Sequence, residues 1–172
     1  MLDRMKARRI DTHLGRKVLR LTADRVVMED GEIPADMILF MPGLTGPAWI
    51  EATDLPKSPG GFIGADELCR VPGFDRVYVV GDAGSFPGPD WLPKQAHQAD
   101  LQATAAADNV AAELKGRAPS RRFKPELACI VDTLDAGILV FRDEKRSLAL
   151  PALGPMHALK QAFEHRYVSA YR

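Results

Sequence analysis

Residues 77–83 read Val77-Tyr78-Val79-Val80-Gly81-Asp82-Ala83, and they carry the clearest signal for the fold. Their apolar run is typical of a strand buried on both faces, and it stops at a Gly-Asp pair. In open α/β sheets, ligands bind beyond the carboxyl ends of such strands. Gly81 would let a ligand approach the backbone closely, and Asp82 could accept hydrogen bonds from hydroxyl groups. The alternative is an ordinary Gly-Asp turn that ends a strand.

A long Ala- and Gln-rich segment follows, from Lys94 to Lys115, and Gly116 ends it. Pro93 stands where a first helical residue is preferred, so the sequence predicts a strand, a loop and a helix in succession. The free backbone amides at the helix start, together with the Lys94 cation, would stabilise negative charge on a bound ring. Alanine is also the best helix former, so helix formation alone explains the small residues equally well.

Three further β-type runs lie upstream of this unit. Residues 17–21 and 25–29 are short, and Asp30-Gly31 after them is a strong tight-turn signal, which predicts a small antiparallel meander. Residues 37–41 are all apolar and are stopped by Pro42-Gly43. This third run predicts a strand that is buried on both faces of a parallel sheet.

The region downstream of Gly116 has a different pattern. Residues 117–124 are basic and contain proline, which is typical of a linker. Three β-type runs at 127–133, 138–142 and 147–150 predict a second antiparallel sheet, with a turn at Asp135-Ala136-Gly137.

The last segment, 155–172, predicts a helix with one apolar face. The residues of that face are spaced by three and four positions: Met156, Leu159, Phe163, Tyr167 and Tyr171. Such a face packs on a core, or it contacts a partner or a membrane surface.

Composition excludes several classes of protein. The 23 basic and 23 acidic residues cancel, which argues against a nucleic-acid partner, and 46% hydrophobic residues indicate a globular chain. No apolar run is long enough to span a bilayer, so we expect any membrane contact to be peripheral. Two cysteines and four histidines, without the spacing of a metal site, lead us to expect no metal.

The order of these motifs resembles the pyridine nucleotide-disulfide oxidoreductase superfamily. The resemblance rests on the meander, the run that ends in Met41-Pro42-Gly43-Leu44-Thr45-Gly46, the 77–83 stretch, and the helix start Pro93-Lys94-Gln95-Ala96. It covers nearly the whole chain. Within the superfamily, the chain is most similar to sulfide:quinone oxidoreductases, flavocytochrome c sulfide dehydrogenases and type II NADH:quinone oxidoreductases.

The resemblance implies an α/β fold mixed with α+β features: a partial FAD/NAD(P)-binding dinucleotide fold with small antiparallel meanders, and a C-terminal β-sheet plus helix. Residues 1–55 would close a nucleotide-binding domain. Residues 56–116 would form the second half of the FAD-binding domain, and 117–172 a C-terminal sheet and amphipathic helix domain.

The resemblance also implies a set of FAD-binding residues. They are Gly81, Asp82, Ala83, Lys94, Gln95 and Ala96. Asp82 would bind the ribityl or pyrophosphate part, lined by its two neighbours. Lys94 and the next two backbone amides would lie near the pyrimidine side of the isoalloxazine ring. On the last helix, Phe163, Tyr167 and Tyr171 would contact quinone and a membrane surface, although core packing is the alternative for each.

The two cysteines lead to different expectations. By the resemblance, Cys129 is a candidate catalytic residue, because sulfide:quinone oxidoreductases use a pair of redox cysteines beside the flavin. Its partner cysteine would have to come from sequence outside this chain. The alternative is a buried free thiol in an apolar strand. Cys69 fits no role in the family pattern and is expected to be structural.

The expected function follows from these assignments. The chain has no Gly-x-Gly-x-x-Gly fingerprint, so we expect a C-terminal fragment whose parent passes electrons from sulfide to quinone through FAD, and the fragment alone to hold FAD weakly and be inactive. The alternatives are a type II NADH:quinone oxidoreductase fragment, a relative of the soluble ferredoxin or rubredoxin reductases, or a non-catalytic module for dimerisation or membrane binding. The expected location is peripheral membrane or cytoplasmic, and a homodimer is possible.

Overall fold

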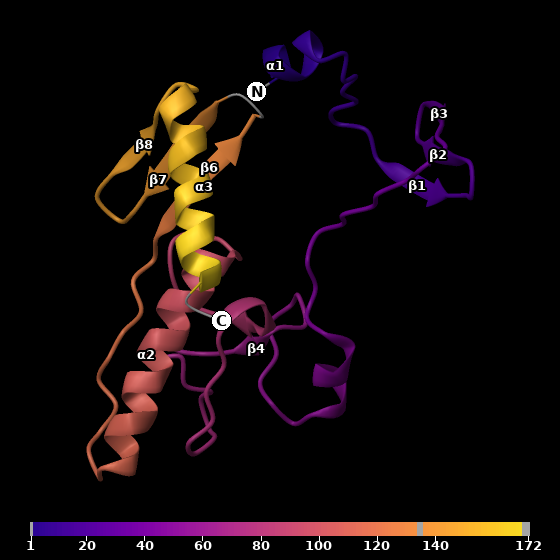
Figure 1. Cartoon of the computed structure of the whole chain (residues 1–172). Helices are drawn as coiled ribbons and strands as arrows, with labels where there is room; N and C mark the ends of the chain where they lie inside the picture. Colours follow the sequence, from indigo (N-terminus) through magenta and orange to yellow (C-terminus); the bar gives the residue numbers. More distant parts are fainter. Residues whose placement is uncertain (1, 134–135, 170–172) are drawn as a thin grey trace. The chain divides into compact units, whose positions relative to one another are not determined.

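The chain divides into two units, Met1–Leu44 and Thr45–Arg172, in a computed structural model that describes residues 2–133 and 136–169. Helices alternate with small sheets in both units (Figure 1). This mixture of helices and mostly antiparallel strands confirms the predicted α/β class.

The first unit contains the predicted meander. Its elements are helix α1 (Leu2–Ala7) and strands β1 (Val18–Leu21), β2 (Arg25–Met28) and β3 (Gly31–Pro34). The strands pair antiparallel in the order β1-β2-β3, and Met28 lies opposite Gly31 across the turn. Arg25 pairs with Asp24 and with Glu32 on the neighbouring strand, which ties the hairpin on its exposed side.

The apolar run 37–41 is not a strand, and the prediction of a buried strand is wrong. Met37, Leu39, Phe40 and Met41 are 77%, 85%, 56% and 92% exposed. A strand buried on both faces needs neighbours that take its backbone hydrogen bonds. Within residues 2–133 and 136–169, no strand pairs with this run. An apolar composition therefore did not suffice to make a strand.

The 76–80 run does not form the predicted strand of a sheet. It makes one antiparallel bridge, between Tyr78 and Arg70, and the Val79 amide donates to the Cys69 carbonyl. Val79 is nevertheless buried, as predicted. Parallel pairing occurs instead between two very short strands, β4 (Ile63–Gly64) and β5 (Gly84–Ser85).

The predicted strand, loop and helix end in a long helix, α2 (Ala96–Leu114). Gln95 is its N-cap, so the helix begins two residues after Lys94. Beyond its C-cap, Gly116 adopts a φ of 70°, the left-handed conformation that favours glycine after a helix. The helix is confirmed, and its start is shifted slightly.

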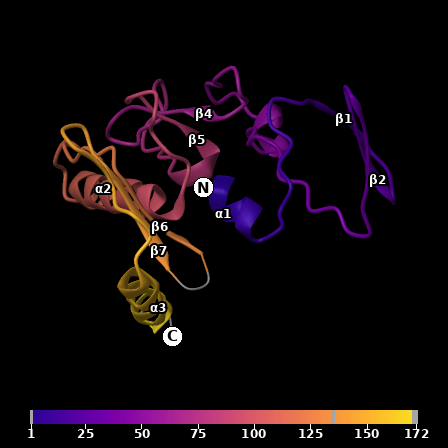
Figure 2. The same cartoon turned by 90° about the horizontal axis from the view of Figure 1, so that it is seen from above.

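The C-terminal sheet and helix are also confirmed. Their elements are β6 (Leu127–Asp132), β7 (Gly137–Arg142), β8 (Ser147–Ala149) and α3 (Gly154–Ser169). The strands pair antiparallel in the order β6-β7-β8, and α3 contacts both β6 and β7 (Figure 2). Asp135 of the predicted turn and Tyr171 of the predicted helix face lie outside the described residues.

The two faces of this sheet have different neighbours. Side chains alternate along a strand, so Ile130 and Asp132 share one face of β6, while Leu127, Cys129 and Val131 share the other. Asp132 accepts a hydrogen bond from His157 of α3 at 3.0 Å. The Cys129 face is therefore the one turned away from α3.

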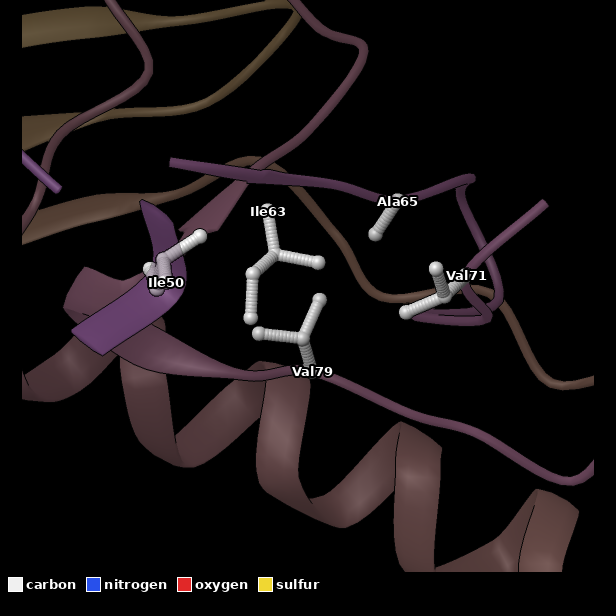
Figure 3. Packing of buried hydrophobic residues seen from close by; sticks show 5 residues of the cluster. All are labelled: Ile50, Ile63, Ala65, Val71 and Val79. Carbon is white, nitrogen blue, oxygen red and sulfur yellow. The ribbon is translucent and has the colours of Figure 1, made fainter. Parts of the chain in front are cut away.

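The core of the second unit consists of two apolar clusters. The first joins Ile50, Ile63, Ala65, Val71 and Val79, and Figure 3 shows Ile63 and Val79 pointing toward one another. The second cluster packs loop residues against α2: Cys69, Ala105, Ala106 and Phe123. Burial, with a contribution from the nearby Asp66 carboxylate, raises the pKa of the Cys69 thiol to about 12. Cys69 is therefore protonated at neutral pH, as expected for a structural cysteine.

Two buried amide side chains on α2 hold the segment between α2 and β6. Asn109 donates to the Leu68 and Arg121 carbonyls and accepts from the Ser120 and Arg121 amides. Gln98 donates to the Lys124 carbonyl and accepts from the Glu126 amide. Residues 117–124, predicted as a linker, thus lie hydrogen-bonded along the helix.

Replacing Asn109 with Ala should lower the free energy of unfolding by about 2 to 4 kcal/mol, because four backbone groups lose their partner in a buried place. Chemical denaturation of the full chain measures this. The matched control is Val110→Ala, a truncation at the next, exposed position of the same helix, which should change stability by less than about 0.5 kcal/mol. Equal effects of the two substitutions would contradict the role of Asn109.

Candidate functional site

A cavity of about 220 Å³ lies where the turn after residue 80 meets the start of α2. The turn contributes Gly81, Asp82, Gly84 and Ser85; the loop contributes Phe86, Pro89, Leu92 and Pro93; the helix start contributes Lys94, Gln95, Gln98, Ala99 and Gln102. Ligand pockets for drug-sized molecules measure roughly 300–1,000 Å³. The cavity therefore suits one part of a larger ligand, such as a ring, rather than a whole dinucleotide.

Helix α2 contacts the turn at Gly81 through two of its side chains, Gln102 and Ala99. The Gly81 amide donates to Gln102 Oε1 at 2.8 Å. Gly81 has a φ of 65°, and a Cβ added there would lie 3.4 Å from the Ala99 Cβ. The backbone conformation and the close helix therefore both favour glycine at this place.

Lys94 holds the other side of the turn. Its Nζ donates to the Asp82 carbonyl at 3.2 Å and to the Gly84 carbonyl at 2.5 Å, and it lies 3.9 Å from the centroid of the Phe62 ring. Burial lowers the pKa of Lys94, while the negative charge of Asp82 opposes this shift. The ammonium is thus partly desolvated and bound to carbonyls and a ring.

Two polar groups that line the cavity form no side-chain hydrogen bond with the described residues. The Asp82 side chain is exposed and makes no hydrogen bond or ion pair there. Gln95 Nε2 is buried and has no hydrogen-bond partner among the described residues. Gln95 also makes no side-chain capping bond, although it is the N-cap of α2. A buried donor without an acceptor is unfavourable, which makes Gln95 notable at the edge of a cavity.

The structure brings together most of the predicted cofactor-binding residues. Gly81, Asp82, Lys94 and Gln95 line the cavity, whereas Ala83 and Ala96 are their neighbours without lining it. Ala83 packs against the first apolar cluster instead.

Sequence reasoning missed the glutamines at positions 98 and 102. Their spacing of four on the predicted helix, in line with Gln95 and Ala99, was the signal that could have found them.

Cys129 lies elsewhere in the second unit. It stands opposite Val140 in the β6-β7 ladder, is half-buried, and does not line the cavity. Cys69, the other cysteine, is buried in the core, and both thiols are free. The described chain therefore brings no second cysteine to Cys129.

The predicted aromatic residues of the last helix lie on its surface. Phe163 is 61% exposed and Tyr167 is 38% exposed, and their rings stack with centroids 5.9 Å apart. The Tyr167 hydroxyl donates to Asp100 on α2 at 3.1 Å. Leu159 is also more than half exposed, so this face of α3 does not serve as core within the described chain.

Two kinds of site have no candidate in the part of the chain that the structure describes. No three His, Cys, Asp or Glu residues are grouped so that they could hold a metal ion. No described helix is both long and apolar enough to cross a membrane.

No family model matches the chain, but individual proteins do. Over 89 residues, it is 30% identical to the internal alternative NAD(P)H-ubiquinone oxidoreductase A1, mitochondrial, of Arabidopsis thaliana, and 32% identical to the Solanum tuberosum protein of the same name. Each alignment covers 49% of this chain but 18% of the relative. The chain thus matches less than a fifth of the length of these relatives.

A solved structure covers more of the chain. The sulfide:quinone oxidoreductase of Aquifex aeolicus matches with a TM-score of 0.81 and 22% identity, over 97% of this chain and 43% of that protein. At this identity the match speaks for the fold. The chain is therefore similar, in sequence and in fold, to the C-terminal part of a pyridine nucleotide-disulfide oxidoreductase-like flavoprotein.

Proposed function

We propose that this chain is the part of a FAD-dependent quinone oxidoreductase that contacts one side of the flavin ring. The observation that carries the proposal is the cavity at the start of α2, where Gln102 and Lys94 grip the turn 81–84. Both kinds of relative are named for a quinone or ubiquinone as one of their substrates. Their names support a quinone as the acceptor, and the cavity supports a position for the flavin ring.

The residues of the cavity fit the ring end of a flavin. Gln95 Nε2, a buried donor without a partner, could donate to a ring carbonyl. The space above Gly81 would be narrowed by any side chain there, so a flat group can approach the backbone. The cavity is too small for the adenosine and pyrophosphate parts. The chain alone is therefore proposed to bind flavin weakly.

The chain's own residues would have electrostatic and positioning roles. When bound, FAD would take two electrons from a donor and pass them to the quinone. Lys94 and the amides at the start of α2 would stabilise negative charge at the edge of the ring. The exposed Asp82 carboxylate would accept hydrogen bonds from ribityl hydroxyls. Phe86 and Leu92 would exclude water from one side of the cavity.

We consider two electron donors for the flavin, sulfide and NAD(P)H. The sulfide proposal assigns Cys129 a redox role, with a partner thiol from sequence outside residues 1–172. The NAD(P)H proposal is favoured by the 89-residue similarity to NAD(P)H-ubiquinone oxidoreductases and by the position of Cys129 away from the cavity. Quinone as the acceptor is common to both.

The exposed apolar face of α3 is proposed to contact a membrane surface peripherally, where a quinone is found. Its most exposed large apolar residues are Leu159 and Phe163. The alternative is a non-catalytic module in which the same face mediates dimerisation.

Removing the Lys94 charge should weaken flavin binding. In a titration of the full chain with FMN, followed by flavin fluorescence, Lys94→Met should raise the dissociation constant about three- to tenfold, since the turn loses two hydrogen bonds to a charged donor. Lys115→Met, at the other end of α2, is the control. The lowered pKa of Lys94 means that its ammonium is lost at a lower pH than that of a free lysine. Wild-type affinity should therefore fall at alkaline pH, and the Lys94→Met profile should be flatter.

The two donors can be separated with the flavin-loaded full-length parent, which would supply the partner cysteine. If sulfide is the donor, it attacks a disulfide between Cys129 and that partner, one cysteine takes the sulfur as a persulfide, and the released thiolate passes the two electrons to the flavin. Cys129→Ala should then abolish bleaching of the flavin absorbance by sulfide, because the disulfide cannot form. If NAD(P)H is the donor, the same variant should be bleached by NAD(P)H as fast as wild type. Cys69→Ala serves as the control for loss of a cysteine. Bleaching of the wild-type parent by neither donor would count against the proposed function.

The membrane contact can be tested by flotation with phosphatidylcholine vesicles that contain phosphatidylglycerol. The wild-type chain should float with the vesicles, and the double variant Leu159→Glu, Phe163→Glu should not, since two charges enter the apolar face. Gln161→Glu adds a charge to the same helix outside the exposed apolar set and should still float. Equal flotation of all three proteins would remove the membrane role of α3.

A further inference from the structure

We propose that Arg142 is a positioning residue that holds the wall of the cavity in place by stacking on Trp91. The C-terminal sheet would thereby set the shape of a cavity to which it contributes no lining residue. This inference rests on the proposed function only in taking the cavity as the place of the ring.

The wall concerned is the loop 86–92, Phe-Pro-Gly-Pro-Asp-Trp-Leu, and its backbone is weakly held. Two of its residues are prolines and lack an amide hydrogen. Among the described residues, its one backbone-to-backbone hydrogen bond runs from the Leu92 amide to the Pro89 carbonyl, inside the loop itself. Side chains must therefore fix the position of this loop.

The two ends of the loop are anchored by packing. Phe86 meets Phe123 edge to face, with centroids 5.5 Å apart and planes at 77°. Leu92 packs against the second apolar cluster. Between them, Trp91 is contacted by a residue from a different part of the chain.

That residue is Arg142, the last residue of β7. Its guanidinium carbon lies 4.7 Å from the centroid of the Trp91 ring, within the range of a cation–π contact. Arg142 forms no ion pair with any described residue, so its guanidinium contacts the Trp91 ring without a competing carboxylate. Its backbone is fixed by pairing with Leu127 on one side and Ser147 on the other. The strand therefore presents the guanidinium from a defined place.

The sheet is in turn tied to the helix that lines the cavity. Gln98, which lines the cavity, holds the backbone at Lys124 and Glu126 immediately before β6. His97 of the same helical turn lies 2.6 Å from the Glu126 carboxylate. These contacts form a closed circuit. It runs from α2 to β6, from β6 to Arg142 on the neighbouring β7, from Arg142 to Trp91, and along the chain from Trp91 through Leu92 to Lys94. A displacement of the sheet would thus be transmitted to the loop.

The test uses the fluorescence of Trp91 in the full chain. Trp49→Phe removes the other tryptophan, which is exposed, so the remaining signal reports on Trp91 alone. In this background, Arg142→Gln should raise the acrylamide quenching constant of Trp91 about two- to fivefold, because the ring loses the guanidinium that covers it. It should also shift the amide NMR signals of Gly84 and Gly88. Arg142→Lys, which keeps the charge but not the planar stacking group, should have an intermediate effect.

Arg146→Gln is the matched control, since Arg146 is an exposed arginine in the hairpin between β7 and β8 and contacts no ring of residues 2–133 or 136–169. It should leave quenching and glycine signals unchanged. If Arg142→Gln behaves like Arg146→Gln, the inference is overturned. If Arg142→Gln alters the far-UV circular dichroism, a Trp91→Leu, Arg142→Gln double-mutant cycle on the unfolding free energy decides instead: a coupling above about 0.5 kcal/mol supports the contact and additivity refutes it.

An FMN titration separates this inference from the proposed function. A loosened Trp91 in Arg142→Gln, together with no FMN binding by the wild-type chain, would support the positioning contact and count against the flavin site. FMN binding by the wild-type chain, together with no change at Trp91 in Arg142→Gln, would support the flavin site and count against the positioning contact.

Discussion

The hydrogen bond from the Gly81 amide to Gln102 Oε1 is the contact on which the cavity depends. It fixes the turn in its left-handed conformation and sets that turn against a buried face of α2. Gln98 and Asn109 extend the same principle along the helix by taking up backbone groups of residues 120–126. A helix that buries amide side chains can bind irregular chain segments which have no ladder partners of their own.

This constraint explains how a cavity exists in a unit with few regular strands. In a larger sheet, backbone hydrogen bonds between strands would fix a loop. In the second unit, side-chain contacts fix the loop instead: Lys94 binds two carbonyls, Phe86 packs on Phe123, and Arg142 packs on Trp91. The site is small, and the chain matches only part of the length of its relatives.

The chain also carries surfaces that its own residues do not cover. The run 37–41 is apolar and exposed, and so is one face of α3. Exposed apolar surface of this extent is unfavourable in water and is typical of contact with another surface. For α3, the proposed surface is a membrane; for 37–41, the described chain offers no neighbouring strand.

The elements predicted best were those that local patterns specify. The meander, α2, the C-terminal sheet and α3 each have a period, a turn or a cap within a few residues, and the structure contains all of them. Four of the six predicted cofactor-binding residues, Gly81, Asp82, Lys94 and Gln95, lie together in one cavity, because a short loop brings the helix start back to the turn. The apolar runs 37–41 and 76–80 were predicted as strands and do not form ladders, since a strand depends on neighbours that no local pattern reveals.

The fold class, the order of the elements and the turn at Gly81-Asp82 can be predicted from sequence, because helix propensity, turn residues and apolar spacing act over short distances. Folding is needed to bury Gln98, Gln102 and Asn109, to bind Lys94 to the turn and to bring Arg142 to Trp91. Those contacts join residues far apart in the chain. Their partners are backbone groups and rings whose positions exist only once the chain has folded.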